Sequence, residues 1–208
     1  MGPIRDSAAW KRLLVAIEKQ PTRMVEGRLA NFVYAPPLPP LDDRREVRRV
    51  PVEVRAAVDT AKLEAVQLPN DAESRATAGV ASLVADDRET AVRELEQAVR
   101  LQPDNPFFLN DLSAALLALA QRTTRPDDFS RARAAAERAM RIAPDLNEPY
   151  FNRALALEEL HLESQSAAAW RVVAARERGS PWGKEAESHL TRRPNGSDGE
   201  AGVNVPRR

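Results

Sequence analysis

The chain has 208 residues and no cysteine, and its 31 Lys and Arg side chains are balanced by 31 Asp and Glu side chains. This length holds one or two small domains, the neutral net charge argues against nucleic acid or an acidic membrane as a partner, and the lack of cysteine excludes disulfides and thiolate metal sites. Charged residues interrupt the apolar run of the first 20 residues, which is not the pattern of a signal peptide or membrane anchor, so we expect a cytoplasmic protein.

A short amphipathic helix is predicted at the start of the chain, over residues 7–20. Apolar residues such as Trp10 recur there at helical spacing, Asp6 or Ser7 is available as N-cap, and Pro21 provides a stop. The apolar stripe of this helix needs a partner. We expect that partner to be the rest of the chain, and another protein is the alternative.

A linker is predicted to follow this helix. The stretch 23–34 alternates imperfectly and could be extended, whereas the prolines of 35–41 forbid a helix interior and favour a stiff polyproline-type spacer. Two Pro-x-x-Pro frames, 36–39 and 37–40, could dock into an aromatic groove, but a spacer is the commoner role of such a run. Residues 1–51 thus form an N-terminal region of helix and linker.

Three prolines further along each close an apolar helical run, at Pro69, Pro103 and Pro144, with spacings of 34 and 41 residues. A fixed period in the 30s is the sequence mark of a stacked helical array. Other residues keep the same register before the last two prolines, and a third set lies 34 residues after the second. These sets are Ala91, Leu95 and Ala98; Ala132, Ala136 and Ala139; and Ser166, Trp170 and Val173.

The helix that precedes each set aligns as well, with a small residue recurring at Gly79, Ser113 and Ala154. The step between the first two small residues is 34, whereas the step between the alanines that follow them is 41. Seven extra residues therefore lie between Ser113 and Ala132, and the polar run 121–127 is the stretch that fits.

A 34-residue unit with an apolar-small pair, an alanine-bearing second helix and a closing proline resembles the tetratricopeptide repeat (TPR). Leu112-Ser113 and Ala78-Gly79 stand where the family has Leu-Gly, and Trp170 replaces the usual Phe or Tyr. Arg75 in the bulky slot and Arg153 in an apolar slot depart from the pattern. The resemblance implies an all-α fold, an α-solenoid of about three helix-turn-helix units. The units would cover residues 72–105, 106–146 and 147–180.

The chain before and after these units is predicted to cap the array. Residues 52–71 are interpreted as an irregular capping helix, because they end in Pro69 at the offset of the later second helices. Ser180-Pro181 is a good start signal for a C-terminal capping helix over 181–192. Beyond it the composition turns to glycine, serine and charge, so we expect a disordered tail over 193–208.

Sequence patterns for chemistry are missing. The chain has no glycine-rich phosphate loop, no Gly-x-Ser-x-Gly and no His-Glu-x-x-His. Of the two histidines, we expect His161 to partner a helix C-terminus and His189 to be a surface group. Glu158 and Glu159 point to different faces of one helix and cannot act as a pair. We therefore predict that the protein is not an enzyme and has no catalytic residue, metal site or cofactor.

A stacked array offers instead a concave surface lined by its first helices. Helical spacing places on this face Ala76, Val80, Asn110, Ala114, Phe151, Leu155 and Glu158. By the resemblance, Asn152 stands where many peptide-binding repeats have an asparagine that grips a ligand's backbone, a task that suits an amide because it offers donor and acceptor together. Asp111 occupies the equivalent place one unit earlier and could only accept.

The expected ligand follows from the same face. The family's clamp for C-terminal carboxylates needs lysines and arginines there, and these are mostly absent. We therefore expect a helical or extended segment with apolar anchors and some positive charge. The phenylalanines could instead pack between units, which we favour for Phe108 and leave open for Phe151.

A narrower resemblance rests on residues 150–158, 168–171 and 179–182. These look like the repeat segment of large bacterial proteins that carry a caspase-like CHAT protease after their array, and 27–36 is similar to the segment before those repeats. Protease activity does not carry over, because this chain has no cysteine.

Three functions stay open. The first, which we prefer, is a non-catalytic scaffold that binds a protein or peptide, with no nucleic acid and no membrane as partner. The second is a regulatory or anchoring subunit of a separately encoded enzyme such as a CHAT protease. The third is a homo-oligomer formed through the end of the array or the Trp10 helix.

Overall fold

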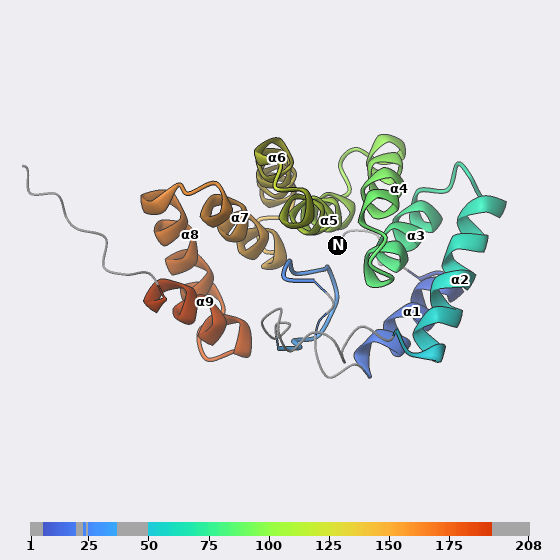
Figure 1. The fold of residues 1–208 in the computed structure, drawn as a ribbon, viewed down its shortest axis with the longest axis horizontal. Helices are drawn as coiled ribbons and strands as arrows, with labels where there is room; N and C mark the ends of the chain where they lie inside the picture. Colours follow the sequence, from blue (N-terminus) through green and yellow to red (C-terminus); the bar gives the residue numbers. More distant parts are fainter. Residues whose placement is uncertain (1–5, 20–22, 24, 37–49, 193–208) are drawn as a thin grey trace, which may run out of the picture.

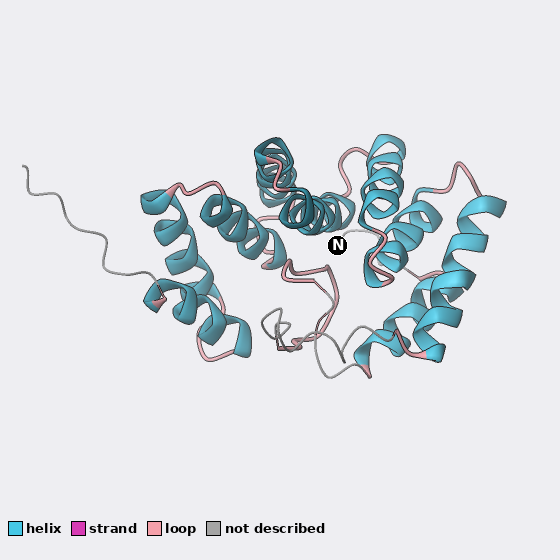
Figure 2. Cartoon of the chain, in the orientation of Figure 1, coloured by secondary structure: helices cyan, strands magenta, loops and turns pink. Residues whose placement is uncertain are grey.

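The computed structural model describes residues 6–19, 23, 25–36 and 50–192, and within these ranges it contains nine α-helices and no strand (Figure 2). The helices are α1 (Ala8–Glu18), α2 (Val52–Gln67), α3 (Ala72–Val84), α4 (Arg88–Leu101), α5 (Pro106–Thr123), α6 (Pro126–Ile142), α7 (Glu148–Glu159), α8 (Glu163–Arg176) and α9 (Pro181–Thr191). The all-α class predicted from the sequence is confirmed. The tail 193–208 and residues 37–49, which include Pro37, Pro39 and Pro40, lie outside the described residues.

Successive helix pairs follow one another in an arc (Figure 1). Within each pair α3 packs on α4, α5 on α6 and α7 on α8, while α3, α5 and α7 also contact one another in sequence. These three first helices lie along the inner side of the arc, and α4 and α6 lie along the outer side (Figure 1). We call the inner side the concave groove. The helices α1 and α2 form one end of the arc, and α9 packs on α8 at the other.

The repeated prolines act through the residues that precede them. Leu68, Gln102 and Ala143 end α2, α4 and α6 with ψ angles of 65°, 82° and 80°. A proline ring clashes with a helical residue before it and moves that residue toward extended backbone. Each proline therefore stops its helix at the same point of the repeat and starts the turn to the next unit.

The small residue of each first helix lets the helices of a pair approach closely. A Cβ added to Gly79 would lie 2.6 Å from Leu95 Cγ and 3.2 Å from the carbonyl oxygen of Ala91. One unit later, the Ser113 hydroxyl donates a hydrogen bond of 2.8 Å to the carbonyl oxygen of Ala132. The spacing that recurs along the sequence thus corresponds to one repeated helix–helix contact.

The seven extra residues of the middle unit lengthen its helices. The helix α5 has 18 residues, against 13 in α3 and 12 in α7, and α6 has 17, against 14 in both α4 and α8. Within the polar run 121–127, only Thr124 and Arg125 lie between the two helices, and Thr124 makes the reversal with φ of +53°.

The N-terminal helix packs on its own chain, as expected. The helix α1 contacts α2 and α3, and its Trp10 and Leu13 are buried. The Ser7 hydroxyl accepts from the Trp10 amide at 3.1 Å. The Glu73 carboxylate of α3 accepts from the amides of Asp6 and Ser7, both at 2.7 Å. These bonds fix the start of α1 against the array.

A loop fills the hollow of the arc (Figure 1). It comprises residues 23–36, of which all but Met24 are described, and we call it the groove loop. It turns back at Asn31, whose φ of +67° is left-handed. Its two ends meet, because the Arg23 amide donates to the Pro36 carbonyl oxygen at 3.1 Å. No helix among the described residues is both long and apolar enough to cross a membrane.

Candidate interaction groove

Two buried asparagines hold the backbone of the groove loop at Arg28. The Arg28 amide donates to Asn152 Oδ1 at 2.6 Å, and the Arg28 carbonyl oxygen accepts from Asn152 Nδ2 at 2.9 Å and from Asn110 Nδ2 at 3.0 Å. Both asparagine side chains are fully buried. Because the bonds go to peptide groups, this clamp binds the main chain whatever the side chain at this position.

The clamp is completed by Asp111 and by a bond between the two amides. Asp111 Oδ1 accepts from the Ala30 amide at 2.8 Å and from Asn110 Nδ2 at 3.2 Å, and Asn152 Nδ2 donates to Asn110 Oδ1 at 2.9 Å. Stacking of α5 against α7 brings together residues 42 positions apart. The bonds among these three side chains fix the orientation of each amide independently of the loop.

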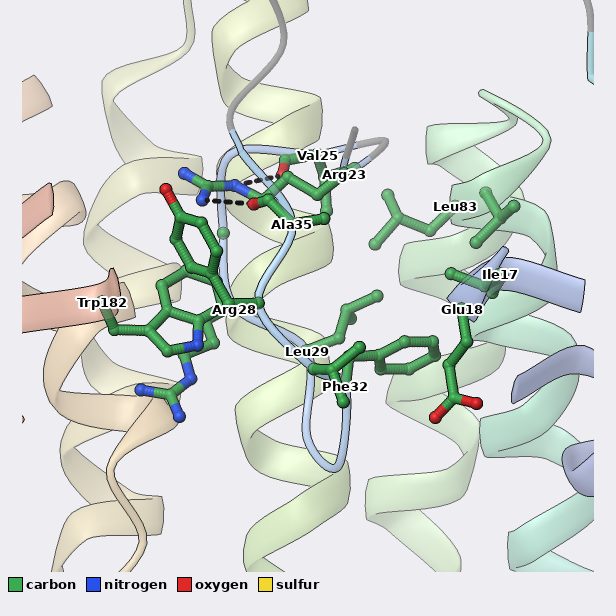
Figure 3. A pocket seen from close by; sticks show the side chains of 14 residues that line it. Ile17, Glu18, Arg23, Val25, Arg28, Leu29, Phe32, Ala35, Leu83 and Trp182 are labelled. Carbon is green, nitrogen blue, oxygen red and sulfur yellow. Dashed lines mark hydrogen bonds between the residues drawn. The ribbon is translucent and has the colours of Figure 1, made fainter. Parts of the chain in front are cut away.

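Arg23 ties the ends of the groove loop to α9. Its guanidinium makes a two-point ion pair with Glu185, with Nη1 2.8 Å from Oε2 and Nη2 bonded to Oε1. The same group donates from Nε to the Val25 carbonyl oxygen at 3.1 Å and from Nη1 to the Ala35 carbonyl oxygen at 3.3 Å (Figure 3). Such fork-shaped pairs are the strong form of charge-assisted bonding.

Arg28 makes a second ion pair, with Glu177 beside α9. Arg28 Nη1 lies 2.5 Å from Glu177 Oε1, and both side chains are nearly buried, at 11% and 12% exposure. Burial alone would raise the pKa of the Glu177 carboxyl group, but the hydrogen bond and charge of Arg28, with bonds from Ser180 and Asn147, lower that pKa below its ordinary value. The carboxylate is therefore stabilised in its charged form.

An aromatic wall backs both arginines. Trp182 of α9 lies under the guanidinium groups of Arg23 and Arg28, at 5.0 and 4.5 Å from its ring centre. Tyr34 of the groove loop and Phe151 of α7 meet the same indole edge to face at 4.9 and 5.1 Å. Cation–π contacts of this kind add to the ion pairs in a desolvated place.

Gly27 allows the groove loop to approach α5. A Cβ at this position would lie 3.0 Å from both Cα and Cβ of Ala114 and 3.3 Å from Asn152 Oδ1. Even a Cβ there would require the loop or α5 to shift by a few tenths of an ångström. A cavity of about 70 Å³ remains beside the loop, and the end of α1, the end of α3 and Trp182 of α9 also line it (Figure 3).

Eight of the nine residues that the sequence placed on the concave face fall into three groups. Asn110, Asp111, Ala114 and Asn152 face the groove loop, as the contacts above show. Phe151 is buried between Trp170 and Trp182, with the Arg23 guanidinium 5.7 Å from its ring, so it packs within the array and also meets the loop. Ala76, Val80 and Leu155 are buried.

Glu158, the ninth of these residues, bonds within the array. Its Oε2 accepts from Trp170 Nε1 at 2.6 Å and lies 3.1 Å from His189 Nδ1. The expectation that His189 is a surface group is wrong: its side chain is 13% exposed and its ring stacks on Trp170 at 4.1 Å. The reason is that α9 folds back on α8. His161 lies two residues beyond the end of α7, with a left-handed φ of +55°.

Sequence reasoning missed the groove loop and its partners on α9 and in the turn before α9. Gly27, Arg23 and Arg28 lie in a stretch without periodicity. The carboxylates that pair with the two arginines lie 149 and 162 residues away in the sequence. The one available signal was the stretch 27–36, which resembled a segment that precedes repeats elsewhere but had no assigned place. No group of three or more side chains suited to a metal ion occurs among the described residues.

Comparisons with known proteins concern the fold. No protein-family model and no curated protein matches the chain. Among solved structures, the chain is similar to the TPR domain of Arabidopsis OM64, with a TM-score of 0.52 and 25% identity over 59% of this chain and 96% of that one. One structure of MamA gives a TM-score of 0.52 and 20% identity over 69% and 72% of the two chains, and another gives 0.51 and 15% over 76% and 93%. The MamA likenesses show the fold alone.

Proposed function

The chain has the tetratricopeptide-repeat fold, and on that basis we propose that it is a non-catalytic scaffold that holds a peptide or protein segment in its concave groove. The fold itself supports protein–protein interaction in general. The finer assignment to the concave groove rests on the residues that face it.

The asparagine clamp is the observation that carries this proposal. Asn110 and Asn152 hold the peptide group of Arg28 through both its amide and its carbonyl oxygen. These residues lie on first helices, where solenoids present their binding surface. Main-chain bonds provide affinity for an extended segment, and neighbouring side-chain contacts provide the specificity.

The charge of the groove supports a cationic partner. The carboxylates of Asp111, Glu177 and Glu185 contact the groove loop. Arg23 forms an ion pair with Glu185, and Arg28 forms one with Glu177. A segment without positive charge would leave Glu185 and Glu177 nearly buried without the guanidinium groups that now pair with them, which is costly. The proposed partner is thus an extended segment with apolar anchors and positive charge.

Crosslinking followed by mass spectrometry in the native host tests this function. An Asn152→Asp variant keeps the acceptor but loses the donor to the Arg28 carbonyl oxygen, and we expect it to lose the specific crosslinks made by the wild type. Asn70→Asp, at an exposed turn, is the matched control and should keep them. Identical crosslinks from all three proteins would reject the concave groove as the binding site.

A further inference from the structure

We infer that the concave groove takes, from a partner polypeptide, a segment with the pattern Arg-x-x-x-Gly-Arg-apolar-Ala, and that the groove loop is the tethered occupant which this segment displaces. The inference rests on the proposed function, because it names the ligand class of the same groove. Each position of the pattern is derived from a contact of residues 23–30.

The loop is held by the contacts that a separate ligand would make. It belongs to no helix, and it is bound through backbone clamping at Arg28 and Ala30 and ion pairing at Arg23 and Arg28. Its partners lie on α5, on α7, on α9 and in the turn before α9, 81 to 162 residues further along the chain. A covalent link to the array is therefore not needed for any of these contacts to form.

Charge fixes the two arginine positions. Glu185 and Glu177 are each nearly buried beneath a guanidinium group, and their side chains are 7% and 12% exposed. Buried carboxylates need a cation with matching geometry, and the planar guanidinium meets two carboxylate oxygens at once, as Arg23 does with Glu185. The indole of Trp182 lies under both groups and also favours arginine over lysine, because a planar guanidinium stacks on an aromatic face.

Space fixes the small positions. A Cβ on Gly27 would lie 3.0 Å from Ala114, a tight contact that favours glycine before the second arginine. Ala30 is fully buried while its amide donates to Asp111, which favours a small side chain at this position. Leu29 between them is buried and apolar. Together these contacts define the pattern more narrowly than the backbone clamp alone.

Displacement requires no change in any helix. The loop enters and leaves the groove at one point, where Arg23 and Pro36 are hydrogen-bonded. Its packing is incomplete, because the cavity of about 70 Å³ lies between it and the ends of α1 and α3. An incoming segment with the same pattern replaces the backbone bonds at Arg28 and Ala30 and the two arginine ion pairs with equal ones. It competes only against the high effective concentration of the tethered loop.

A fluorescent synthetic peptide of residues 22–36 is the probe, and the full-length chain is the receptor. In an Arg23→Glu, Arg28→Glu variant the tethered loop faces Glu185 and Glu177 with like charge, while the receptor side of the groove is unchanged. We expect fluorescence anisotropy to show peptide binding at least about tenfold tighter to this variant than to the wild type. Peptides carrying Gly27→Val or Arg28→Glu should bind neither protein.

The outcomes separate this inference from the proposed function. Equal affinity for both proteins would mean that the loop does not compete, and no binding to a variant that circular dichroism shows to be folded would reject the pattern. If the double variant does not fold, a Gly27→Val full-length chain serves as receptor, with the same expectations. A native partner that needs Asn152 yet lacks the pattern would leave the proposed function standing and overturn this inference. A dimer of the wild type by light scattering, abolished by the same variants, would assign the occupant to a second copy and also overturn it.

Discussion

At the scale of single residues, glycines are retained for different physical reasons. Gly79 lies inside α3, where a Cβ would be 2.6 Å from Leu95 Cγ, so space excludes a side chain. Gly179 has a φ of +81° and no atom within 4 Å of an added Cβ, so only its backbone conformation requires glycine. The two positions therefore respond differently to substitution.

Gly79→Val is expected to lower the free energy of unfolding by about 2 kcal/mol, because overpacking α3 against α4 outweighs the gain of roughly 0.5 kcal/mol in helix propensity. Urea denaturation followed by circular dichroism measures this change. Adding Leu95→Ala should recover part of the loss, which a double-mutant cycle would show as coupling. Gly179→Ala should cost about 1 kcal/mol and show no coupling to Leu95. Simple additivity at Gly79 and Leu95 would contradict the close contact.

The positions that belong to the repeat could be predicted from the sequence, and so could two residues that depart from its pattern. Arg75 and Arg153 stand in slots where the repeat has bulky or apolar residues, and the structure pairs them with Glu94 at 2.7 Å and Glu137 at 3.0 Å on neighbouring second helices. Sequence register also placed Asn152 on the inner face. It could not place Arg28 beside it, because no local pattern links residues 124 positions apart.

At the scale of elements, α9 and the turn before it connect the array to the groove loop. Trp182 and Glu185 lie on α9, and Glu177 lies in the turn before it. The capping helix was predicted from Ser180 and Pro181 to cover the end of the stack. Its additional contact with the loop could not be predicted, since the position of α9 depends on how α8 and α7 stack.

Low pH is expected to weaken the contact between Arg28 and Glu177. The pKa of Glu177 is below its ordinary value of 4.5 in the folded protein, so the unfolded state binds the proton more tightly. The stabilisation is therefore fully present above pH 4.5 and is lost as pH falls through the lowered pKa. Hydrogen exchange of the groove-loop amides, measured between pH 7 and pH 3 and corrected for intrinsic rates, should show this loss. Glu177→Gln should remove that part of the pH dependence; an unchanged profile would contradict it.

Trp182→Ala is expected to cost about 3 kcal/mol or more of unfolding free energy, because a large buried ring is lost. It should also raise the hydrogen exchange of the Arg28 and Ala30 amides, because the indole supports both arginines. Leu95→Ala is the control: it should cost a similar amount without a local effect on the loop. Equal protection of the two amides in both variants would show that Trp182 stabilises the array alone.

At the scale of the whole molecule, the groove loop adds long-range contacts to an array of short-range ones. Stacked repeats contact only their neighbours, so their stability is close to a sum of local terms. The loop instead contacts α5, α7 and α9 together. The solenoid and its succession of helix pairs could be predicted from proline spacing, whereas the docking of the groove loop could not, because it depends on contacts without periodicity.

Replacing residues 25–35 with a Gly-Ser linker of equal length is expected to reduce the cooperativity of unfolding. Urea transitions followed by circular dichroism and by tryptophan fluorescence should coincide in the wild type and separate in the variant. An equal-length Gly-Ser replacement of residues 38–48, which follow the groove loop in the sequence, is the control and should leave the transitions coincident. Coincident transitions in all three proteins would mean that the helices alone provide the cooperativity.

The hydrogen bond between the Arg23 amide and the Pro36 carbonyl oxygen has a practical consequence. Because the two ends of this 14-residue stretch already touch, joining them head to tail should yield a macrocycle that retains the bound shape. Such a preorganised ring loses less conformational entropy on binding than the linear peptide does. It is the natural starting point for a synthetic antagonist of the scaffold.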